Sequence, residues 1–177
     1  MENEKLSLIF RARKTILQML RDRNYHVPED TSENFESFKS KFSNVLMQED
    51  CMSQIVQNIS KIYKTIPKDK NSVQQGIFVL FQDKPQFSVS DISATTGYLG
   101  GEKMEDNQHS SETNRAIIVS TGKITSLAEK EIAKLRPSKI FIEFFNVKDL
   151  QVNITEHELV PKHIIISQEE KEALLIK

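Results

Sequence analysis

The residues best suited to chemistry stand close together near the end of the chain. His157 and His163 lie a few positions apart with Pro161 between them, and Glu156 and Glu158 flank the first histidine. Imidazole and carboxylate groups can bind zinc or move protons. A zinc site, however, usually has four ligands, typically including cysteine or a His-x3–5-His pair on a helix. No cysteine or further histidine lies near this pair, so the sequence predicts no metal here and favours a hydrogen-bonding or interface role.

Other catalytic patterns are weak. The sequence Glu169-Glu170-Lys171 spells the Glu-x-Lys of restriction-type metallonucleases, but it lies in a predicted helix. The strand positions that such an enzyme would fill with acids hold Phe81, Ile117 and Ile118. There is no glycine-rich phosphate loop and no Gly-x-Ser-x-Gly, and the single cysteine, Cys51, lacks a local protease context. The sequence therefore predicts no catalytic residues, no metal and no cofactor.

The composition is that of a soluble intracellular protein. The 177 residues are 38% hydrophobic and 28% charged, with a formal net charge of -1. No apolar run approaches the roughly 20 residues that span a bilayer, and the first residues do not resemble a signal peptide. One cysteine fits a reducing compartment. Residues 1–25 and 61–70 are locally basic, but a dedicated nucleic-acid-binding protein would be more basic overall.

Apolar spacing predicts the helices that position these groups. Helices are expected at three places, residues 4–23, 32–42 and 91–99. The first should end before Pro28, since a residue that precedes proline avoids the helical region. Ser32 is expected to cap the second helix, and Ser90 or Asp91 the third. Residues 51–66 are ambiguous, because their isoleucines have helical spacing whereas MSQIVQ alone fits a strand.

Three continuous apolar runs predict buried strands, at residues 76–81, 115–120 and 139–145. Between the last two, Ser126 and Glu129 form a capping box, so a helix is expected over residues 127–135 and ends before Pro137. A strand, a helix and a strand with short joints favour a parallel pair and an α/β fold. Residues 100–113 are expected to form a polar loop.

The clearest resemblance to a known family lies at residues 153–163, NITEHELVPKH. This stretch resembles the signature His-x-Leu-Val-Pro-x-His of the fifth subunit shared by eukaryotic nuclear RNA polymerases, a family that includes an archaeal counterpart. Four further pieces resemble the same family: RARKTILQMLRDRNYHV its first helix, residues 35–38 its Leu-Glu-x-Phe-Lys, GIFVLFQDKP a strand that ends in proline, and RAIIVSTGKITSLAEK a stretch that normally contains Thr-Pro-Ser-Ala. The resemblance covers nearly the whole chain in pieces and is weaker at residues 43–74 and 97–113.

This resemblance implies an α/β fold in two parts. Residues 1–149 would form an N-terminal jaw domain with a nuclease-like α/β/α sheet that lacks catalytic residues, and MSQIVQ would be one of its strands. Residues 150–177 would begin a small C-terminal α/β assembly module that docks on the largest polymerase subunit. The family continues beyond the position of Lys177, so the chain is expected to be a C-terminally truncated or divergent short member.

The function that the resemblance implies is structural. The chain would be a non-catalytic subunit of DNA-directed RNA polymerases I, II and III in the nucleus, part of the lower jaw near downstream DNA. Its implied partners are the largest subunit, other core subunits, downstream duplex DNA and transcription regulators, with no membrane. Two alternatives stay open: a stand-alone adaptor of the same fold that binds transcription regulators, and a nuclease-fold hydrolase, which the missing carboxylates disfavour.

Two groups of site residues follow from the resemblance. The DNA-proximal residues are Lys123, Thr125 and Ser126, where the lysine and the backbone of the other two would contact phosphate weakly at a helix N-terminus. Thr125-Ser126-Leu127-Ala128 stands where the family has Thr-Pro-Ser-Ala. The assembly segment contains Asn153, His157, Leu159, Val160, Pro161 and His163.

Within the assembly segment, Ile154, Leu159 and Val160 are expected to pack, and Pro161 to fix the chain direction. The histidines would satisfy local backbone or partner groups, and residues 164–166 would lead into a strand. Ser167 and Glu170 then form a second capping box that begins the last helix.

Overall fold

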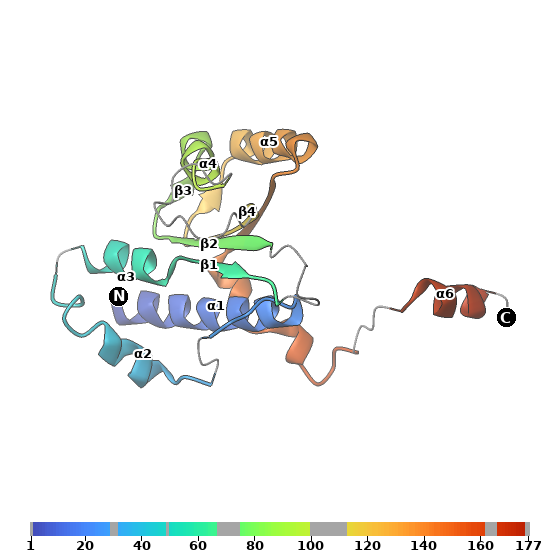
Figure 1. The fold of residues 1–177 in the computed structure, drawn as a ribbon. Coiled ribbons are helices and arrows are strands. Elements are labelled where there is room, and N and C mark those ends of the chain that lie inside the picture. The colour runs from blue at the N-terminus through green and yellow to red at the C-terminus, as the bar shows by residue number, and fades with distance from the viewer. Residues whose placement is uncertain are drawn as a thin grey trace.

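The chain folds around a four-stranded sheet with helices on both faces (Figure 1). The computed structural model describes residues 2–28, 32–48, 50–66, 75–99, 113–161 and 166–175. The helices are α1 (Glu2–Asp22), α2 (Phe35–Lys41), α3 (Cys51–Ile59), α4 (Val89–Thr96), α5 (Ser126–Leu135) and α6 (Gln168–Leu175). The sheet contains β1 (Lys61–Lys64), β2 (Gly76–Gln82), β4 (Thr113–Ser120) and β6 (Phe141–Asn146). The short 3-10 helices are η1 (Arg136–Ser138), η2 (Val147–Leu150) and η3 (Ile154–Glu156).

The sheet is mixed, with the order β1-β2-β4-β6. β2, β4 and β6 run parallel, and β1 pairs with β2 in the antiparallel direction. The three predicted strands, the parallel strand–helix–strand unit and the α/β class are therefore confirmed. A second, smaller sheet pairs β3 (Gln86–Phe87) with β5 (Lys123–Ile124) in parallel. The predicted polar loop falls almost entirely on residues 100–112, which lie outside the described residues.

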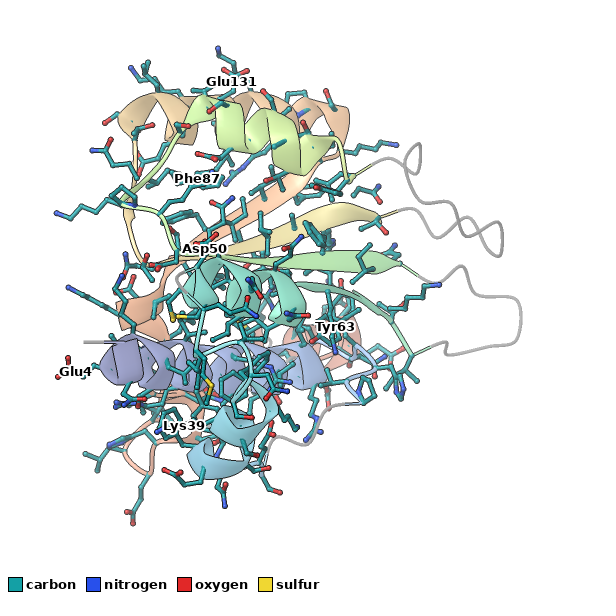
Figure 2. All side chains as sticks on the ribbon, turned by 90° about the vertical axis from the view of Figure 1, so that its left-hand side faces the viewer. Glu4, Lys39, Asp50, Tyr63, Phe87 and Glu131 are labelled. Atoms are coloured by element: carbon teal, nitrogen blue, oxygen red, sulfur yellow. The ribbon has the colours of Figure 1, made fainter. Side chains whose placement is uncertain are left out.

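Helices α4 and α5 cover one face of the sheet, while α1 and α3 cover the other (Figure 1). Successive strand residues point to opposite faces. Ile117 and Val119 accordingly belong to the core beneath α1 and α3, whereas Ala116 and Ile118 belong to the core beneath α4 and α5. Phe87 lies fully buried in this second core, between the sheet and the two helices (Figure 2). Because both faces are covered, the central strands are continuously apolar, which is why sequence reasoning could find them.

The first helix, α1, forms as predicted. Its apolar stripe is buried and comprises Leu6, Ile9, Phe10, Ala12, Ile16, Leu17 and Leu20. The helix ends well before Pro28, because Asn24 adopts a left-handed conformation with φ of 65°. The Tyr25 N–H then donates to the Leu20 carbonyl at 2.9 Å, as in a Schellman-type cap. Asparagine tolerates this backbone region better than most residues.

Two predicted helix caps are wrong by a few residues. Helix α2 is capped by Asn34, whose side chain accepts a hydrogen bond from the Ser37 N–H at 2.8 Å, and Ser32 lies outside the helix. Helix α4 is capped by Ser88, and Asp91, the third residue of the helix, completes the capping box. Each helix begins at a polar residue whose own backbone is extended, and Asn34 and Ser88 both have this conformation. The residue type alone does not reveal that geometry.

The strand predicted for MSQIVQ is also wrong, since these residues lie in helix α3. The buried residues of α3 are Cys51, Ile55, Val56 and Ile59, which share one helical face. That face packs into the core with α1 and the sheet. The helical period of the isoleucines therefore outweighs the strand preference of β-branched side chains, a preference that depends strongly on context.

The carboxylate of Asp91 joins the start of α4 to the loop after β2. It accepts hydrogen bonds from Lys84 Nζ at 2.6 Å and from the Ser88 N–H at 2.9 Å. Burial alone would raise the pKa of Asp91, but the hydrogen bonds from Lys84 and Ser88 outweigh it and hold that pKa below its usual value. Such a carboxylate adds stability above its unfolded pKa and loses this contribution as the pH falls through its folded pKa.

We therefore expect Asp91→Asn to lower the free energy of unfolding by about 1–2 kcal/mol at neutral pH. The difference from the wild-type chain should shrink as the pH falls below about 4. Urea unfolding at pH 7 and at about pH 2.5 measures both values. Asp50→Asn is the matched control, because Asp50 precedes α3 without a side-chain cap. An Asp91→Asn deficit that stays the same at both pH values would contradict this account.

Candidate nucleic-acid interface and assembly segment

The DNA-proximal residues predicted from the sequence lie where β5 (Lys123–Ile124) turns into α5, with Lys123 as the first residue of β5 and Ser126 as the first residue of α5. Thr125 has extended backbone, and its side-chain oxygen accepts from the Ala128 N–H at 3.3 Å. The Thr125 carbonyl accepts from the Glu129 N–H at 3.0 Å, as at the start of a helical turn. The cap is therefore Thr125, and Ser126 is the first residue of the helix. The predicted Ser126 capping box is wrong by one position, although the helix itself is confirmed.

Gly122 brings this turn against the loop that follows β2. A Cβ atom at Gly122 would lie 2.2 Å from the Lys84 carbonyl oxygen and 2.3 Å from the Pro85 carbonyl carbon. The Gly122 carbonyl accepts from Asn146 Nδ2 at 2.9 Å, so the end of β6 joins the same contact. The Lys123 N–H donates to the Pro85 carbonyl at 3.3 Å. These contacts position Lys123 against two other segments of the chain, the loop after β2 and the end of β6.

The structure restricts which groups can meet a phosphate here. Lys123 is exposed, as a phosphate contact requires. The Thr125 N–H donates to the Phe87 carbonyl at 3.0 Å, so this N–H group is already paired within the fold. The N–H groups of Ser126 and Leu127 are in the first helical turn, where no intrahelical partner exists, and both residues are exposed.

A cleft of about 400 Å³ lies beside this turn, between the start of α1, the loops after β2 and β4, and η2. We call it the lysine cleft; its lining residues are Lys5, Leu8, Asp83, Lys84, Pro85, Thr121, Val147 and Lys148. Sequence reasoning did not find this group, because it gathers residues from four separate segments. The only signal was the break of each apolar strand run into a polar turn, and such turns cluster at one edge of a parallel sheet.

Polar contacts hold the start of the assembly segment against α1. Asn153 Oδ1 accepts from the Thr155 N–H at 3.1 Å and so caps η3. Asn153 Nδ2 donates to Gln18 Oε1 at 3.3 Å, and Gln18 Nε2 donates to the two carboxylate oxygens of Glu156 at 3.0 and 2.9 Å. Just before this segment, Gln151 Nε2 donates to the Leu8 carbonyl at 3.1 Å.

His157 serves the local backbone. Its Nδ1 atom accepts from the Leu159 N–H at 3.3 Å, and its carbonyl accepts from the Val160 N–H at 2.9 Å. These bonds form a compact turn just before Pro161, which is exposed. His163 lies outside the described residues, so the structure describes only one histidine of the predicted pair.

The packing predicted for the assembly segment is wrong for two of its apolar side chains. Ile154 is 66% exposed and Leu159 is 85% exposed, because the segment meets α1 through polar groups. Val160 is half-buried. Residues 164–166 were expected to lead into a strand; only Ile166 among them is described, and it lies in no strand.

The second predicted capping box, at the start of α6, is confirmed. The Ser167 N–H donates to Glu170 Oε2 at 2.8 Å, and the Glu170 N–H donates to Ser167 Oγ at 3.3 Å. These hydrogen bonds lower the pKa of Glu170. Helix α6 has no buried residue and stands apart from the other elements (Figure 1).

Across the described ranges, no three His, Cys, Asp or Glu side chains are grouped so that they could hold a metal ion. In the same ranges, no helix is both long enough and apolar enough to cross a membrane. The site is thus an exposed basic turn beside a cleft, together with a surface segment that presents apolar side chains. Such surfaces bind partners.

Two family models match the chain. "RNA polymerase Rpb5, N-terminal domain" matches residues 3–98, and "RNA polymerase Rpb5, C-terminal domain" matches residues 152–177. The first covers α1 to α4, and the second covers the whole assembly segment together with α6. The chain therefore belongs to the Rpb5 family of RNA polymerase subunits, which confirms the resemblance found in the sequence.

Curated relatives extend this similarity along the chain. The chain is 35% identical to "DNA-directed RNA polymerases I, II, and III subunit rpabc1" of Dictyostelium discoideum over 176 residues, which cover 98% of this chain and 75% of the relative. It is 33% identical to the RPABC1 subunit of Caenorhabditis briggsae, over 96% of this chain and 72% of the relative. It is 29% identical to "DNA-directed RNA polymerase subunit 5-like protein 1" of Arabidopsis thaliana, over 98% of this chain and 74% of the relative.

Proposed function

We propose that this chain is a non-catalytic subunit shared by DNA-directed RNA polymerases I, II and III, and that it acts in the nucleus. The observation that carries the proposal is the similarity over 96–98% of the chain to proteins named as shared subunits of these polymerases. Its partners are then the other polymerase subunits. The adaptor and hydrolase alternatives are not favoured, because the relatives are named as polymerase subunits.

A division of labour within the chain is part of the proposal. Residues 1–149 act as a jaw domain with a nuclease-like sheet, and residues 150–177 begin the module that docks on the largest subunit. Both hydrophobic cores support this division, since their buried residues end at Leu150. Beyond it the chain exposes Val152, Ile154 and Leu159, each more than 60% accessible. Apolar side chains displayed in this way suit a protein partner.

Depletion of the chain in its own cells tests the proposal. A shared subunit is needed by every polymerase that contains it, so synthesis of labelled RNA by polymerases I, II and III should fall together. Re-expression of the same chain should restore all three. Loss of only one activity, or of none, would contradict a shared role.

We further propose that the exposed Lys123 ammonium and the first-turn N–H groups of α5 contact a phosphate of downstream DNA. Unpaired N–H groups at a helix N-terminus attract anions, and Lys123 adds a formal charge. The contact needs no base, so it is independent of sequence. The contact involves one or two phosphates and should therefore weaken only modestly with salt. The logarithm of the binding constant should fall with the logarithm of the salt concentration by a slope of about −0.9 per phosphate.

Lys123→Glu is accordingly expected to abolish crosslinks from this turn to downstream DNA and to lower the salt resistance of the elongation complex. A photocrosslinker at position 121 in the intact polymerase reports the contact. Lys139→Glu is the matched control, because Lys139 is also exposed but follows the other end of α5. Unchanged DNA crosslinks and unchanged salt stability in Lys123→Glu would refute the contact.

A further inference from the structure

The lysine cleft has a lining of two kinds. Apolar surface comes from Leu8 of α1, which is half-buried, and from the exposed Pro85, whereas Val147 lines the cleft but is only 2% exposed. Lys5, Lys84 and Lys148 bring positive charge to the same cleft. The cleft opens where the parallel strands β2 and β4 end, which is the edge at which α/β sheets generally bind ligands. A volume of about 400 Å³ is within the usual range for a binding pocket and is large enough for a few side chains.

The charges of the cleft are only partly balanced from within. Asp83 lies 3.4 Å from the Lys5 ammonium and accepts from the Thr121 hydroxyl at 2.7 Å. Lys84 is paired with Asp91 at 2.6 Å. Lys148 has no ion-pair partner within the described part of the chain. Against three lysines, the two aspartates leave one positive charge, in the same cleft as the apolar surface of Leu8 and Pro85.

From this combination we infer that the lysine cleft binds a short acidic peptide segment of a partner protein. One bulky apolar side chain of the segment lies on Leu8 and Pro85, and a neighbouring carboxylate meets the Lys148 ammonium. The bound segment needs both an apolar side chain, which contacts the apolar lining, and a carboxylate, which pairs with Lys148. This inference goes beyond the proposed function, because neither the DNA contact nor the assembly segment uses the cleft.

Duplex DNA fits the cleft less well than a peptide. A phosphate backbone has no apolar group to cover Leu8 and Pro85, and two of the three lysines already have carboxylate partners. The exposed turn at Lys123 offers DNA an open surface instead. The preference for a peptide therefore rests on the apolar lining, and the experiment varies that property separately from charge.

The test is a titration of the ¹⁵N-labelled full chain with an N-acetylated heptapeptide that alternates aspartate with leucine and phenylalanine. We expect amide shifts at Leu8, Thr121, Val147 and Lys148, which saturate with peptide concentration. Lys148→Glu should weaken binding by about tenfold or more, because it replaces attraction with repulsion. Lys130→Glu, an exposed charge change on α5, should change the affinity less than about twofold. The spectra themselves show that each variant is folded.

Three further probes decide the chemistry. A heptapeptide with asparagine for aspartate removes charge, one with alanine for leucine and phenylalanine removes apolar surface, and a short duplex DNA supplies phosphate alone. We expect each to bind the cleft at least about tenfold more weakly than the acidic apolar peptide. The inference is overturned by the absence of cleft shifts with that peptide, by equal binding of either altered peptide, or by stronger cleft binding of DNA. All readouts use the isolated chain, so they do not depend on its role in a polymerase.

Discussion

Replacing Leu159 by aspartate is expected to cut the recovery of polymerase subunits with this chain by at least about tenfold, while leaving its folding unchanged. Leu159 is 85% exposed and belongs to neither core, so the substitution removes no internal packing. If the side chain is instead buried against another subunit, a carboxylate there costs several kcal/mol unless it is paired. A cost of about 1.4 kcal/mol already corresponds to tenfold in affinity.

Met47→Asp is the matched control for Leu159→Asp. Met47 is 90% exposed and lies in the turn region after α2, far along the chain from the assembly segment. Affinity purification of each tagged variant, with quantification of the other polymerase subunits, measures the effect. Thermal unfolding of the isolated variants checks the fold. Full recovery with Leu159→Asp, or an equal loss with Met47→Asp, would count against the assembly segment as the docking surface.

Gly122→Ala is expected to lower the free energy of unfolding by about 3 kcal/mol. The added methyl group would overlap the Lys84 carbonyl oxygen at 2.2 Å and the Pro85 carbonyl at 2.3 Å, which are backbone atoms. That backbone is held by the hydrogen bond from the Lys123 N–H to Pro85, so it cannot move without breaking the β3–β5 pair. Overpacking of this kind typically costs about 1–3 kcal/mol, and a rigid obstacle favours the upper end.

Urea unfolding of Gly122→Ala and of Gly97→Ala provides the comparison. At Gly97 a Cβ atom would come no closer than 3.3 Å to the Ala94 carbonyl, so the change there should stay within about 1 kcal/mol. Gly122→Ala should also lose the DNA crosslinks of the Lys123 turn, because the turn moves with the broken pair. Equal stability of the two variants would show that the Gly122 contact is not a constraint on the fold.

The elements that were predicted correctly share one property. Each has a hydrophobic pattern that is complete within a single continuous segment of the sequence. The apolar runs of β2, β4 and β6 and the stripe of α1 are of this kind. Helix α3 was harder, because its β-branched residues fit a strand locally and only packing against α1 and the sheet decides for the helix. The caps at Ser88 and Thr125 depend on backbone angles that the choice among neighbouring serines, threonines and acids does not reveal.

The site was predictable only in its sequence-local parts. Lys123 and the His157 turn could be proposed from the sequence, because each lies within a short recognisable stretch. The pairing of β3 with β5 was not, since two-residue strands carry no period. The lysine cleft was missed because Lys5, Lys84 and Lys148 meet only in three dimensions. The exposure of Leu159 could not be foreseen either, because an apolar residue that covers a partner looks the same in sequence as one that packs internally.

The central claim is that this chain is a shared polymerase subunit, and purification from its own cells tests it most directly. The chain is tagged at its N-terminus, expressed at its native level and isolated under mild salt, and the bound proteins are quantified by mass spectrometry. The account predicts recovery of the largest subunits of polymerases I, II and III together, with their summed amount close to that of the incorporated chain. Recovery of one polymerase alone, or of none above an untagged control, would contradict it.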